Sequence, residues 1–189
     1  MIQFRFHGRG GQGVVSGAEM LSVAAFLEGK HAQAFPSFGS ERRGAPVVSY
    51  CRIDDKEIRL REPVLEPDVL VVQDTTLFRA IDVFSGLTAD GYVLINTSQS
   101  LEDLGIADAL KSLLPKHVSS VPATELAIQY VKQPKPNAAL LGAVAAVTGI
   151  VQIDSVVSAI EKKFPGKIVE ANVLAARAAY ATAQSNLQG

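Results

Sequence analysis

The sequence is poor in cysteine, in net charge and in long apolar runs, and each shortage excludes a class of protein. Cys51 is the only cysteine in 189 residues, and one thiol cannot form an internal disulfide, hold an iron–sulfur cluster or build a cysteine-rich zinc site. The net charge is −1 without a long basic run, so the electrostatic footprint of a nucleic-acid binder is missing. The longest apolar run, residues 138–151, is shorter than the roughly 20 residues that span a bilayer.

These shortages predict a protein that binds neither nucleic acid nor membrane. The N-terminus also has no basic-then-apolar signal segment, which argues against export. We therefore expect a cytoplasmic protein. If it works in redox chemistry, its electron carrier must sit elsewhere than on cysteine.

Length and apolar patterning predict one globular domain over residues 1–189, with strands alternating with helices. The strand patterns cover residues 2–6, 30–35, 47–53, 57–61, 68–73, 92–95 and 117–121. The helical patterns cover residues 14–26, a stretch through Phe84 that follows a loop and cap at residues 74–76, and residues 101–114, 123–131, 138–149, 153–164 and 170 to about 185, with Asn137 as an N-cap. This order predicts an α/β fold with a doubly wound, mostly parallel sheet and a C-terminal helical cluster. A turn at Asp54 and Asp55 predicts an inserted β-hairpin of residues 47–53 and 57–61.

A glycine-rich turn stands between the first strand pattern and the first helix pattern. Gly8, Gly10 and Gly13 form G-x-G-x-x-G, in which glycine permits positive φ and close approach of backbone N–H groups to a ligand. The positive end of the following helix would face a phosphate or carboxylate. Two interpretations stay open from these residues alone: a purely structural βα turn, or a cradle for an anion.

Several loops are expected at one rim, because ligands of open α/β sheets lie beyond the carboxyl ends of the strands. The loops are residues 8–13, 37–44, 73–76 and 96–98. Their N–H and O–H donors suit phosphate oxygens and come from Arg9, Gln12, Ser37, Ser40, Arg42, Arg43, Thr75, Asn96 and Thr97. The alternative is that these loops are solvated turns.

The sequence argues against an NAD enzyme and offers no catalytic constellation. The acidic residue expected about 20 residues after the fingerprint glycines is absent from residues 32–35, and Glu41 lies too far along. An arginine could still accept the 2′-phosphate of NADP. The three histidines (His7, His31 and His117) lack metal-ligand spacing and are interpreted as structural, no serine stands in G-x-S-x-G, and Cys51 is expected to be buried and inert.

Two motifs resemble the gamma subunit of 2-oxoacid:ferredoxin oxidoreductases. They are HGRGGQG at residues 7–13 and FPSFGSERRGAPV at residues 35–47. Asn137, residues 141–143 and Asn172 also look like that family, so the resemblance runs from about residue 2 to residue 175. The RGAP form of the second motif resembles the pyruvate and branched-chain enzymes, whereas Ser40 departs from several relatives.

The resemblance implies a subunit of a heterotetramer rather than an enzyme by itself. Such enzymes oxidatively decarboxylate a 2-oxoacid with coenzyme A and reduce ferredoxin. Alpha and beta subunits hold thiamine diphosphate with Mg, and [4Fe–4S] clusters lie on a delta subunit or on beta. The gamma subunit is thought to supply part of the coenzyme A site and to support assembly, with no catalytic residue and no metal of its own.

The residues expected at the coenzyme A site are therefore Gly8, Arg9, Gly10, Gly11, Gln12, Gly13, Ser37, Ser40, Glu41, Arg42, Arg43, Gly44, Asn96 and Asn137. A glycine-rich turn at a helix N-terminus suits the pyrophosphate of coenzyme A, and a guanidinium suits its 3′-phosphate. A competing interpretation is that Glu41, Arg42 and Arg43 form ion pairs with partner subunits. A stand-alone NADP- or flavin-dependent oxidoreductase is the alternative function.

Overall fold

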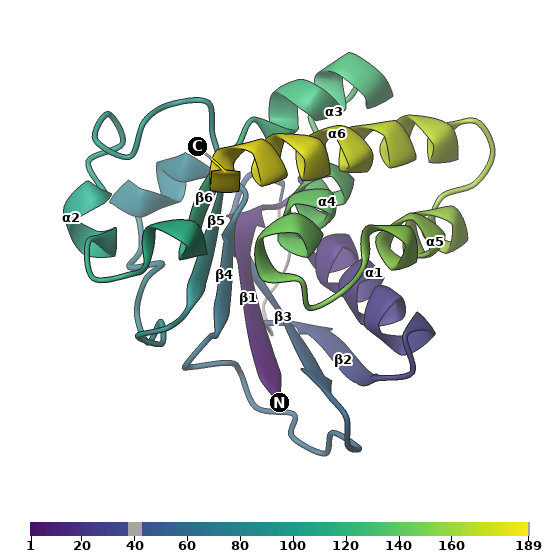
Figure 1. Cartoon of the computed structure of the whole chain (residues 1–189), viewed down its shortest axis with the longest axis horizontal. Helices are drawn as coiled ribbons and strands as arrows, with labels where there is room; N and C mark the ends of the chain where they lie inside the picture. The colour runs from purple at the N-terminus through teal and green to yellow at the C-terminus, as the bar shows by residue number, and fades with distance from the viewer. Residues whose placement is uncertain (38–42, 189) are drawn as a thin grey trace.

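A six-stranded sheet forms the centre of the computed structural model, which describes residues 1–37 and 43–188 (Figure 1). The strand order is β2-β3-β1-β4-β5-β6. The strands are β1 (Ile2–Arg9), β2 (His31–Pro36), β3 (Pro46–Asp54), β4 (Val69–Val72), β5 (Tyr92–Asn96) and β6 (Val118–Val121). Strands β1, β4, β5 and β6 are parallel neighbours, and β3 runs antiparallel to both β1 and β2. The prediction of a mostly parallel sheet is confirmed.

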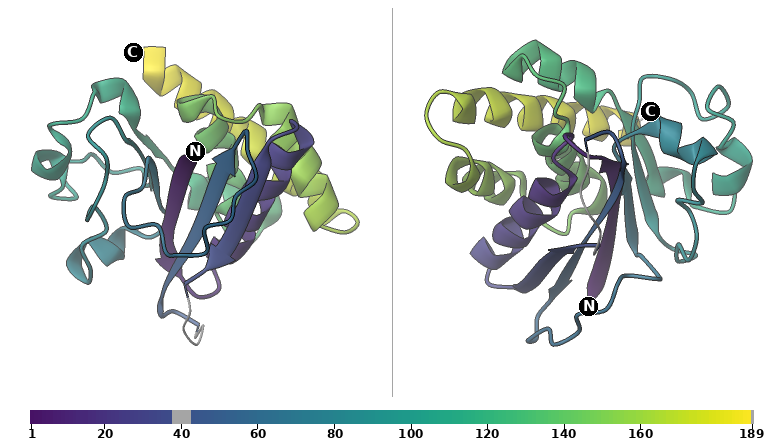
Figure 2. Two further views of the ribbon diagram at one scale, coloured as in Figure 1. Left: turned by 90° about the horizontal axis from the view of Figure 1, so that it is seen from below. Right: turned by 180° about the vertical axis from the view of Figure 1, so that it is seen from behind.

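The chain winds in two directions from β1, because β2 and β3 lie on one side of it and β4, β5 and β6 on the other. One face of the sheet is covered by the longer helices and the other by short helical segments (Figure 2). The helices are α1 (Val14–Leu27), α2 (Ala107–Leu110), α3 (Ala123–Val131), α4 (Asn137–Thr148), α5 (Ile153–Lys163) and α6 (Ile168–Gln188), with 3₁₀ helices η1 (Thr75–Arg79) and η2 (Pro115–His117). The predicted C-terminal helical cluster is α4, α5 and α6.

Side-chain alternation along β1 assigns its residues to the two faces. Phe4 and Phe6 point into the core beneath α1 and α4, where the apolar residues of these helices gather. Leu70 and Val72 of β4 point to the opposite face and pack with Leu77 of η1. The central strand β4 is buried on both faces, which is why its sequence is an uninterrupted apolar run.

Helix α4 is apolar on all sides because it is enclosed on all sides. Ten of its twelve residues are buried, and its main neighbour is α6. A Cβ atom on Gly142 would collide with the backbone carbonyl of Ala176. Glycine at this position therefore allows α4 and α6 to pack with their backbones in contact.

The predicted hairpin of residues 47–53 and 57–61 is wrong in one strand: residues 47–53 form β3 as predicted, but their hairpin partner is β2. Strand β3 pairs with β2 through Ala32↔Ile53 and with β1 through Ile2↔Ile53. Both edges of β3 are therefore occupied, and residues 57–61 form no strand. The loop that joins β2 to β3 carries the second motif.

Two predicted helices are shorter than expected. Residues 75–84 form only η1 (Thr75–Arg79), and residues 101–114 form only α2 (Ala107–Leu110). Gly105 has a φ of +69°, a left-handed conformation that ends a helical turn before α2 begins. Asn137 is not an N-cap: Pro136 occupies that position, and Asn137 is the first residue of α4. No helix in the described ranges is long and apolar enough to cross a membrane.

Candidate anion-binding rim

The glycine-rich turn connects β1 directly to α1, and its glycines meet specific steric demands. Gly13 is the residue before α1 and has a φ of +76°, a region that side chains with a Cβ rarely adopt. A Cβ on Gly13 would lie 2.5 Å from Asn137 Nδ2, and one on Gly8 would lie 2.6 Å from Val14 Cγ2. At Gly8 and Gly13 the turn is therefore packed so tightly against α1 and α4 that a Cβ would force neighbouring side chains to move.

The N-terminus of α1 has no side-chain cap. Gly13 offers no side chain, no acidic residue occupies the first turn, and the first bond along the helix is that of Gly17 N–H to Gly13 carbonyl at 2.9 Å. The N–H groups of a helix's first turn have no intrahelical partner, and together with the helix dipole they favour an anion. Asn137 is buried and places its amide beside this end of α1.

Arg9 is bonded within the rim by its whole guanidinium group. Its Nε and Nη2 donate to Thr76 Oγ1 at 3.0 and 2.7 Å, and its Nη1 donates to the Gly44 carbonyl at 3.0 Å. Its Nε also lies 3.5 Å from Asp74 Oδ2. The side chain of Arg9 therefore connects the end of β1 to η1 and to the second motif.

Gln12 and Asp74 connect the glycine-rich turn to the end of β4. Gln12 Oε1 accepts from the Arg9 backbone N–H at 2.7 Å, and Gln12 Nε2 donates to Asp74 Oδ2 at 2.8 Å. Burial raises the pKa of Asp74, but hydrogen bonds from Thr76 and Gln12 and the charge of Arg9 outweigh it, so the net pKa is lowered. Asp74 is a negatively charged anchor for the two loops.

The side chain of Asn96 connects the segments at the ends of β4, β5 and β6 through hydrogen bonds. Its Nδ2 donates to the Gln73 carbonyl and to Thr124 Oγ1, both at 2.7 Å, and its Oδ1 accepts from the Thr124 N–H at 3.0 Å. All the hydrogen-bonding groups of this amide are thus directed at the protein itself.

The second motif is joined to the glycine-rich turn through the backbone. Gly10 N–H donates to the Ala45 carbonyl at 2.9 Å, and Gly44 N–H donates to the Gly10 carbonyl at 3.0 Å. Arg43 is exposed, and its Cγ would lie 3.8 Å from a Cβ on Gly11. Ser37 is exposed at the end of β2. The expected site residues Ser40, Glu41 and Arg42 lie outside the described residues.

One buried polar residue of the rim, Gln73, was not singled out from the sequence. Gln73 is 2% exposed, and neither atom of its amide group has a hydrogen-bond partner among the described residues. Its Cβ would lie 3.2 Å from a Cβ on Gly8, so it packs under the glycine-rich turn. The available signal was its position: a polar residue directly after a strand of four buried apolar residues.

His7 and Cys51 are both buried, and burial shifts their pKa values in opposite directions. His7 is 6% exposed with both ring nitrogens unpartnered among the described residues, and burial, followed by the charge of Arg5, lowers its pKa to about 4. Cys51 is fully buried, as predicted, and burial raises the pKa of its thiol far above the ordinary value. His7 is therefore neutral and Cys51 protonated at neutral pH.

Two shallow hollows continue the rim along the carboxyl ends of β4, β5 and β6, and they share Thr75 and Gln99. One, of about 320 Å³, is lined by Thr75, Thr76, Phe78, Arg79, Gln99, Asp103 and Leu104. The other, of about 240 Å³, is lined by Thr75, Asn96, Thr97, Ser98, Gln99, Pro122, Thr124 and Glu125. Hydroxyl and amide groups dominate the lining of the second hollow, whereas the first combines them with charged and apolar side chains. The structure therefore brings the loops at residues 8–13, 43–44, 73–76 and 96–98 to one edge of the sheet.

Comparisons with known proteins agree over nearly the whole chain. The sequence model of the pyruvate ferredoxin/flavodoxin oxidoreductase family matches residues 3–182. The pyruvate/ketoisovalerate oxidoreductases common subunit gamma of Pyrococcus furiosus is 51% identical over 95% of this chain and 96% of its own length. Pyruvate synthase subunit PorC of Methanothermobacter thermautotrophicus is 48% identical over 95% of this chain and 94% of its own length.

One solved structure has the same fold as this chain over almost its whole length. The pyruvate oxidoreductase subunit PORC of Thermotoga maritima superposes with a TM-score of 0.79 at 38% identity, covering 96% of both chains. The chain belongs to the pyruvate ferredoxin/flavodoxin oxidoreductase family, as a subunit of the gamma type. The resemblance inferred from the two motifs is confirmed.

Proposed function

We propose that this chain binds part of coenzyme A within a multi-subunit enzyme that oxidatively decarboxylates a 2-oxoacid and reduces ferredoxin. The relatives named for pyruvate and ketoisovalerate make pyruvate and branched-chain 2-oxoacids the proposed substrates. The observation that carries the proposal is the uncapped N-terminus of α1, which the glycine-rich turn leaves without a side chain or an acidic residue. The proposed compartment is the cytoplasm.

The other cofactors are assigned to partner subunits in this proposal. Thiamine diphosphate with Mg and the [4Fe–4S] clusters would lie on alpha, beta and delta subunits, and ferredoxin would accept the electrons. Cys51, the chain's only thiol, is fully buried beneath α1. The part of this chain in the reaction is then to hold and orient the thiol cosubstrate.

The backbone, rather than the charged side chains of the glycine-rich turn, is the proposed ligand of the pyrophosphate. Arg9 and Gln12 already bond to Thr76, Gly44 and Asp74, so they shape the turn. The free donors are the N–H groups of the first turn of α1, which begins at Val14. Phosphate at such a helix N-terminus is a recurrent arrangement because the donors and the dipole act together.

The second motif is proposed to bind the 3′-phosphate of coenzyme A. Arg43 is exposed and its stem passes beside Gly11, so it starts from the same place as the proposed pyrophosphate site. A guanidinium can donate two parallel hydrogen bonds to a phosphate. Arg42 is the second candidate donor, and Ser37 is an exposed hydroxyl at the start of the same loop.

The backbone part of the proposal is tested with proline at the second position of α1. Val15→Pro removes one N–H group that has no partner inside the helix, and proline is tolerated in a first helical turn. Val15→Ala is the matched control, because it shortens the same side chain and keeps the N–H. In the assembled enzyme we expect Val15→Pro to raise the KM for coenzyme A by about tenfold, with Val15→Ala close to the parent.

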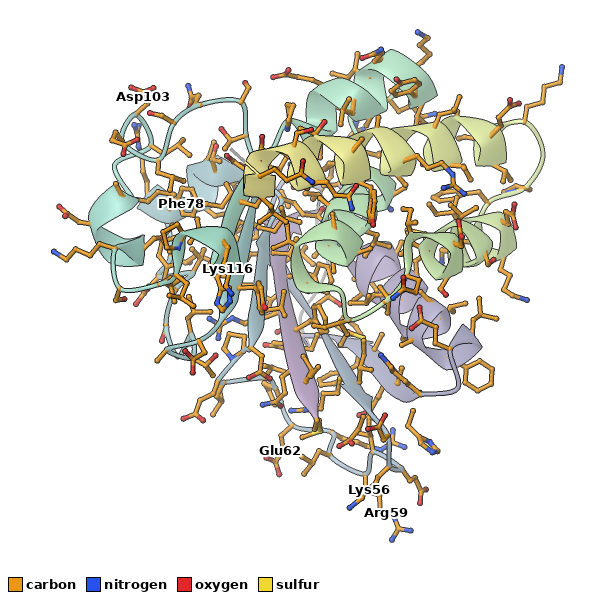
Figure 3. All side chains as sticks on the ribbon, viewed as in Figure 1. Lys56, Arg59, Glu62, Phe78, Asp103 and Lys116 are labelled. Atoms are coloured by element: carbon orange, nitrogen blue, oxygen red, sulfur yellow. The ribbon has the colours of Figure 1, made fainter. Side chains whose placement is uncertain are left out.

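The arginine part is tested with Arg42→Ala/Arg43→Ala and with dephospho-coenzyme A, which lacks the 3′-phosphate. The variant should have a higher KM for coenzyme A and an unchanged KM for the 2-oxoacid. It should also retain little preference for coenzyme A over dephospho-coenzyme A. Lys116→Ala is the control, because this exposed lysine lies at the amino end of β6, away from the rim (Figure 3).

Three results would decide against these assignments. Parent-like kinetics in both variants would reject coenzyme A binding at this rim. Dissociation of the Arg42→Ala/Arg43→Ala complex would instead assign those arginines to a partner subunit. Calorimetric titration of the chain with NADPH or FAD that shows tight binding would favour the stand-alone oxidoreductase.

A further inference from the structure

Residues 56–62 (the 56–62 segment) have a strand pattern in the sequence, but in the structure they pair with none of the described strands. Ile58 and Leu60 alternate with Glu57, Arg59 and Arg61, the period-two pattern that predicts a half-buried strand. The strand that precedes the segment is β3, and β1 and β2 occupy both of its edges. The segment therefore does not make the pairing that its pattern favours with the strand next to it along the chain.

The segment is open along its backbone and its side chains. No backbone–backbone hydrogen bond joins residues 57–62 to any other described residue. Leu60 is 44% exposed, and the ion pair between Arg59 Nη2 and Glu57 Oε2, 2.9 Å long, has side chains that are 85% and 67% exposed. Figure 3 shows Lys56, Arg59 and Glu62 together at the lower end of the molecule, outside the sheet.

The sequence of the segment, Lys-Glu-Ile-Arg-Leu-Arg-Glu, is complementary to its own reverse. When two copies run antiparallel about Arg59, Lys56 faces Glu62 of the second copy, and Glu57 faces Arg61. Ile58 faces Leu60 between these charged pairs. Opposite charges and apolar pairs at directly opposed positions stabilise antiparallel strands. Only Arg59 faces its own kind, and each Arg59 has Glu57 of its own chain as a partner.

A shift of one residue removes this complementarity. Glu57 would then face Glu62 of the second copy, and Ile58 would face Arg61. Like charges at directly opposed positions destabilise a strand pair. The charge pattern thus selects one register, which is the requirement for a specific contact between identical chains.

We propose that two copies of this chain associate through antiparallel pairing of their 56–62 segments about a two-fold axis. The partner is a second copy because the segment offers each charged group a counterpart from the same sequence. Pairing would supply the missing backbone hydrogen bonds and cover Leu60, as in other cases of strand addition. The contact does not depend on coenzyme A binding, because the segment follows β3 at the amino end of β1, whereas the rim lies at the carboxyl end (Figure 1).

The first test is a charge reversal with rescue, measured by sedimentation velocity on the full chain. Arg61→Glu places Glu opposite Glu57 in both halves of the two-fold pair, and we expect the dimer to weaken about tenfold or more. Glu57→Arg/Arg61→Glu restores opposite charges and should restore the dimer. Lys111→Glu is the control, because Lys111 carries the same single positive charge, is 76% exposed and is paired with the exposed Asp108 on α2.

The second test is a register-specific cross-link. Cys51 is fully buried, so Arg59→Cys introduces the only accessible thiol. Under mild oxidation this variant should form a disulfide-linked dimer, both as the full chain and in the assembled enzyme. Lys111→Cys, at the C-terminal end of the distant helix α2, should form no disulfide-linked dimer under the same conditions.

Four results would overturn the proposal. They are a parent chain that is monomeric at every attainable concentration, an Arg61→Glu chain that dimerises like the parent, a double variant that fails to restore the dimer, and an Arg59→Cys chain that forms no more disulfide than Lys111→Cys. Protection of the segment only when other subunits are present, without the Arg59 cross-link, would assign it to a different chain. Matching circular dichroism spectra of all variants would show that none of these results reflects misfolding.

Discussion

The glycine-rich turn and the 56–62 segment lie at opposite ends of β1 and use their polar groups in opposite ways. In the turn, Arg9 and Gln12 bond to other parts of the rim, and the spare donors are backbone N–H groups at the start of α1. In the 56–62 segment the charged side chains are exposed, and the backbone of residues 57–62 makes no backbone–backbone hydrogen bond within the described part of the chain.

The difference shows that a conspicuous charged residue does not by itself mark a ligand contact. In the sequence Arg9 is a candidate phosphate ligand, but in the structure its hydrogen bonds hold the loops of the rim in position. At the glycine-rich turn, the groups available for a ligand are the backbone N–H groups at the start of α1. At the 56–62 segment, a strand pattern is available for pairing with another chain.

The largest expected effect on stability is at Gly13. Gly13→Ala adds a Cβ in a left-handed conformation and 2.5 Å from Asn137 Nδ2, so we expect a loss of about 3 kcal/mol or more in unfolding free energy. Gly11→Ala is the matched control: it also has a positive φ, of +96°, but its nearest neighbour is 3.8 Å away. It should lose only about 1–2 kcal/mol.

Urea unfolding of both variants measures this difference. Asn137→Ala removes the colliding amide, so a double-mutant cycle of Gly13→Ala with Asn137→Ala should show favourable coupling. Equal losses at Gly11 and Gly13, or simple additivity in the cycle, would mean that the packing of the turn against α4 is not what requires glycine.

The next effect concerns acid stability through His7, just before the turn. Its pKa is about 4 in the folded chain and about 6.5 when unfolded, so the unfolded state binds a proton first as the pH falls. The contribution of His7 to stability is complete above about pH 6.5 and is lost between there and pH 4, amounting to at most about 3 kcal/mol. His7→Phe, which keeps a ring and cannot titrate, should flatten the fall in unfolding free energy over this window. An unchanged pH profile would show that His7 is not the group responsible.

A smaller effect is expected at Asp74, the anchor between the turn and β4. Asp74→Asn keeps the shape but weakens the bonds from Gln12, Thr76 and Arg9, so we expect a loss of about 1–2 kcal/mol at pH 7. Because the folded pKa is lowered, the contribution of the carboxylate is present above the unfolded value of about 3.9. It is lost as the pH falls through the folded pKa, so parent and variant should converge in acid. A gap in unfolding free energy that stays constant from pH 7 into acid would contradict this.

The smallest effect is at Arg59, in the 56–62 segment. Its ion pair with Glu57 is as short as the bonds of the rim, at 2.9 Å, but both side chains are largely exposed. Arg59→Ala should therefore change the unfolding free energy of the dilute chain by less than about 0.5 kcal/mol. Thermal unfolding of Arg59→Ala beside Asp74→Asn makes the comparison direct. A loss of unfolding free energy at Arg59 as large as that at Asp74 would contradict this. It would show that side-chain exposure does not explain the difference between the 56–62 segment and the glycine-rich turn.

Much of the fold was predictable because the sheet and the helices have clear periodicity. Residues 69–72 are apolar without interruption and form β4, and residues 123–131 form α3 as predicted. The hairpin was assigned to the wrong strand because residues 57–61 and residues 31–36 both have strand patterns. Only the tertiary arrangement, in which β1 takes one edge of β3 and β2 the other, decides between them.

The sequence by itself determined the α/β class, the family and the position of the glycine-rich turn, because these depend on local periodicity and on motifs at short spacing. Tertiary structure decided which side chains remain free at the rim, because hydrogen bonds such as those of Arg9 to Thr76 and of Asn96 to Thr124 join residues far apart in the chain. It also decided that Asn137 fills the space beside Gly13 rather than capping α4. Long-range packing sets these contacts, and no local pattern in the chain encodes them.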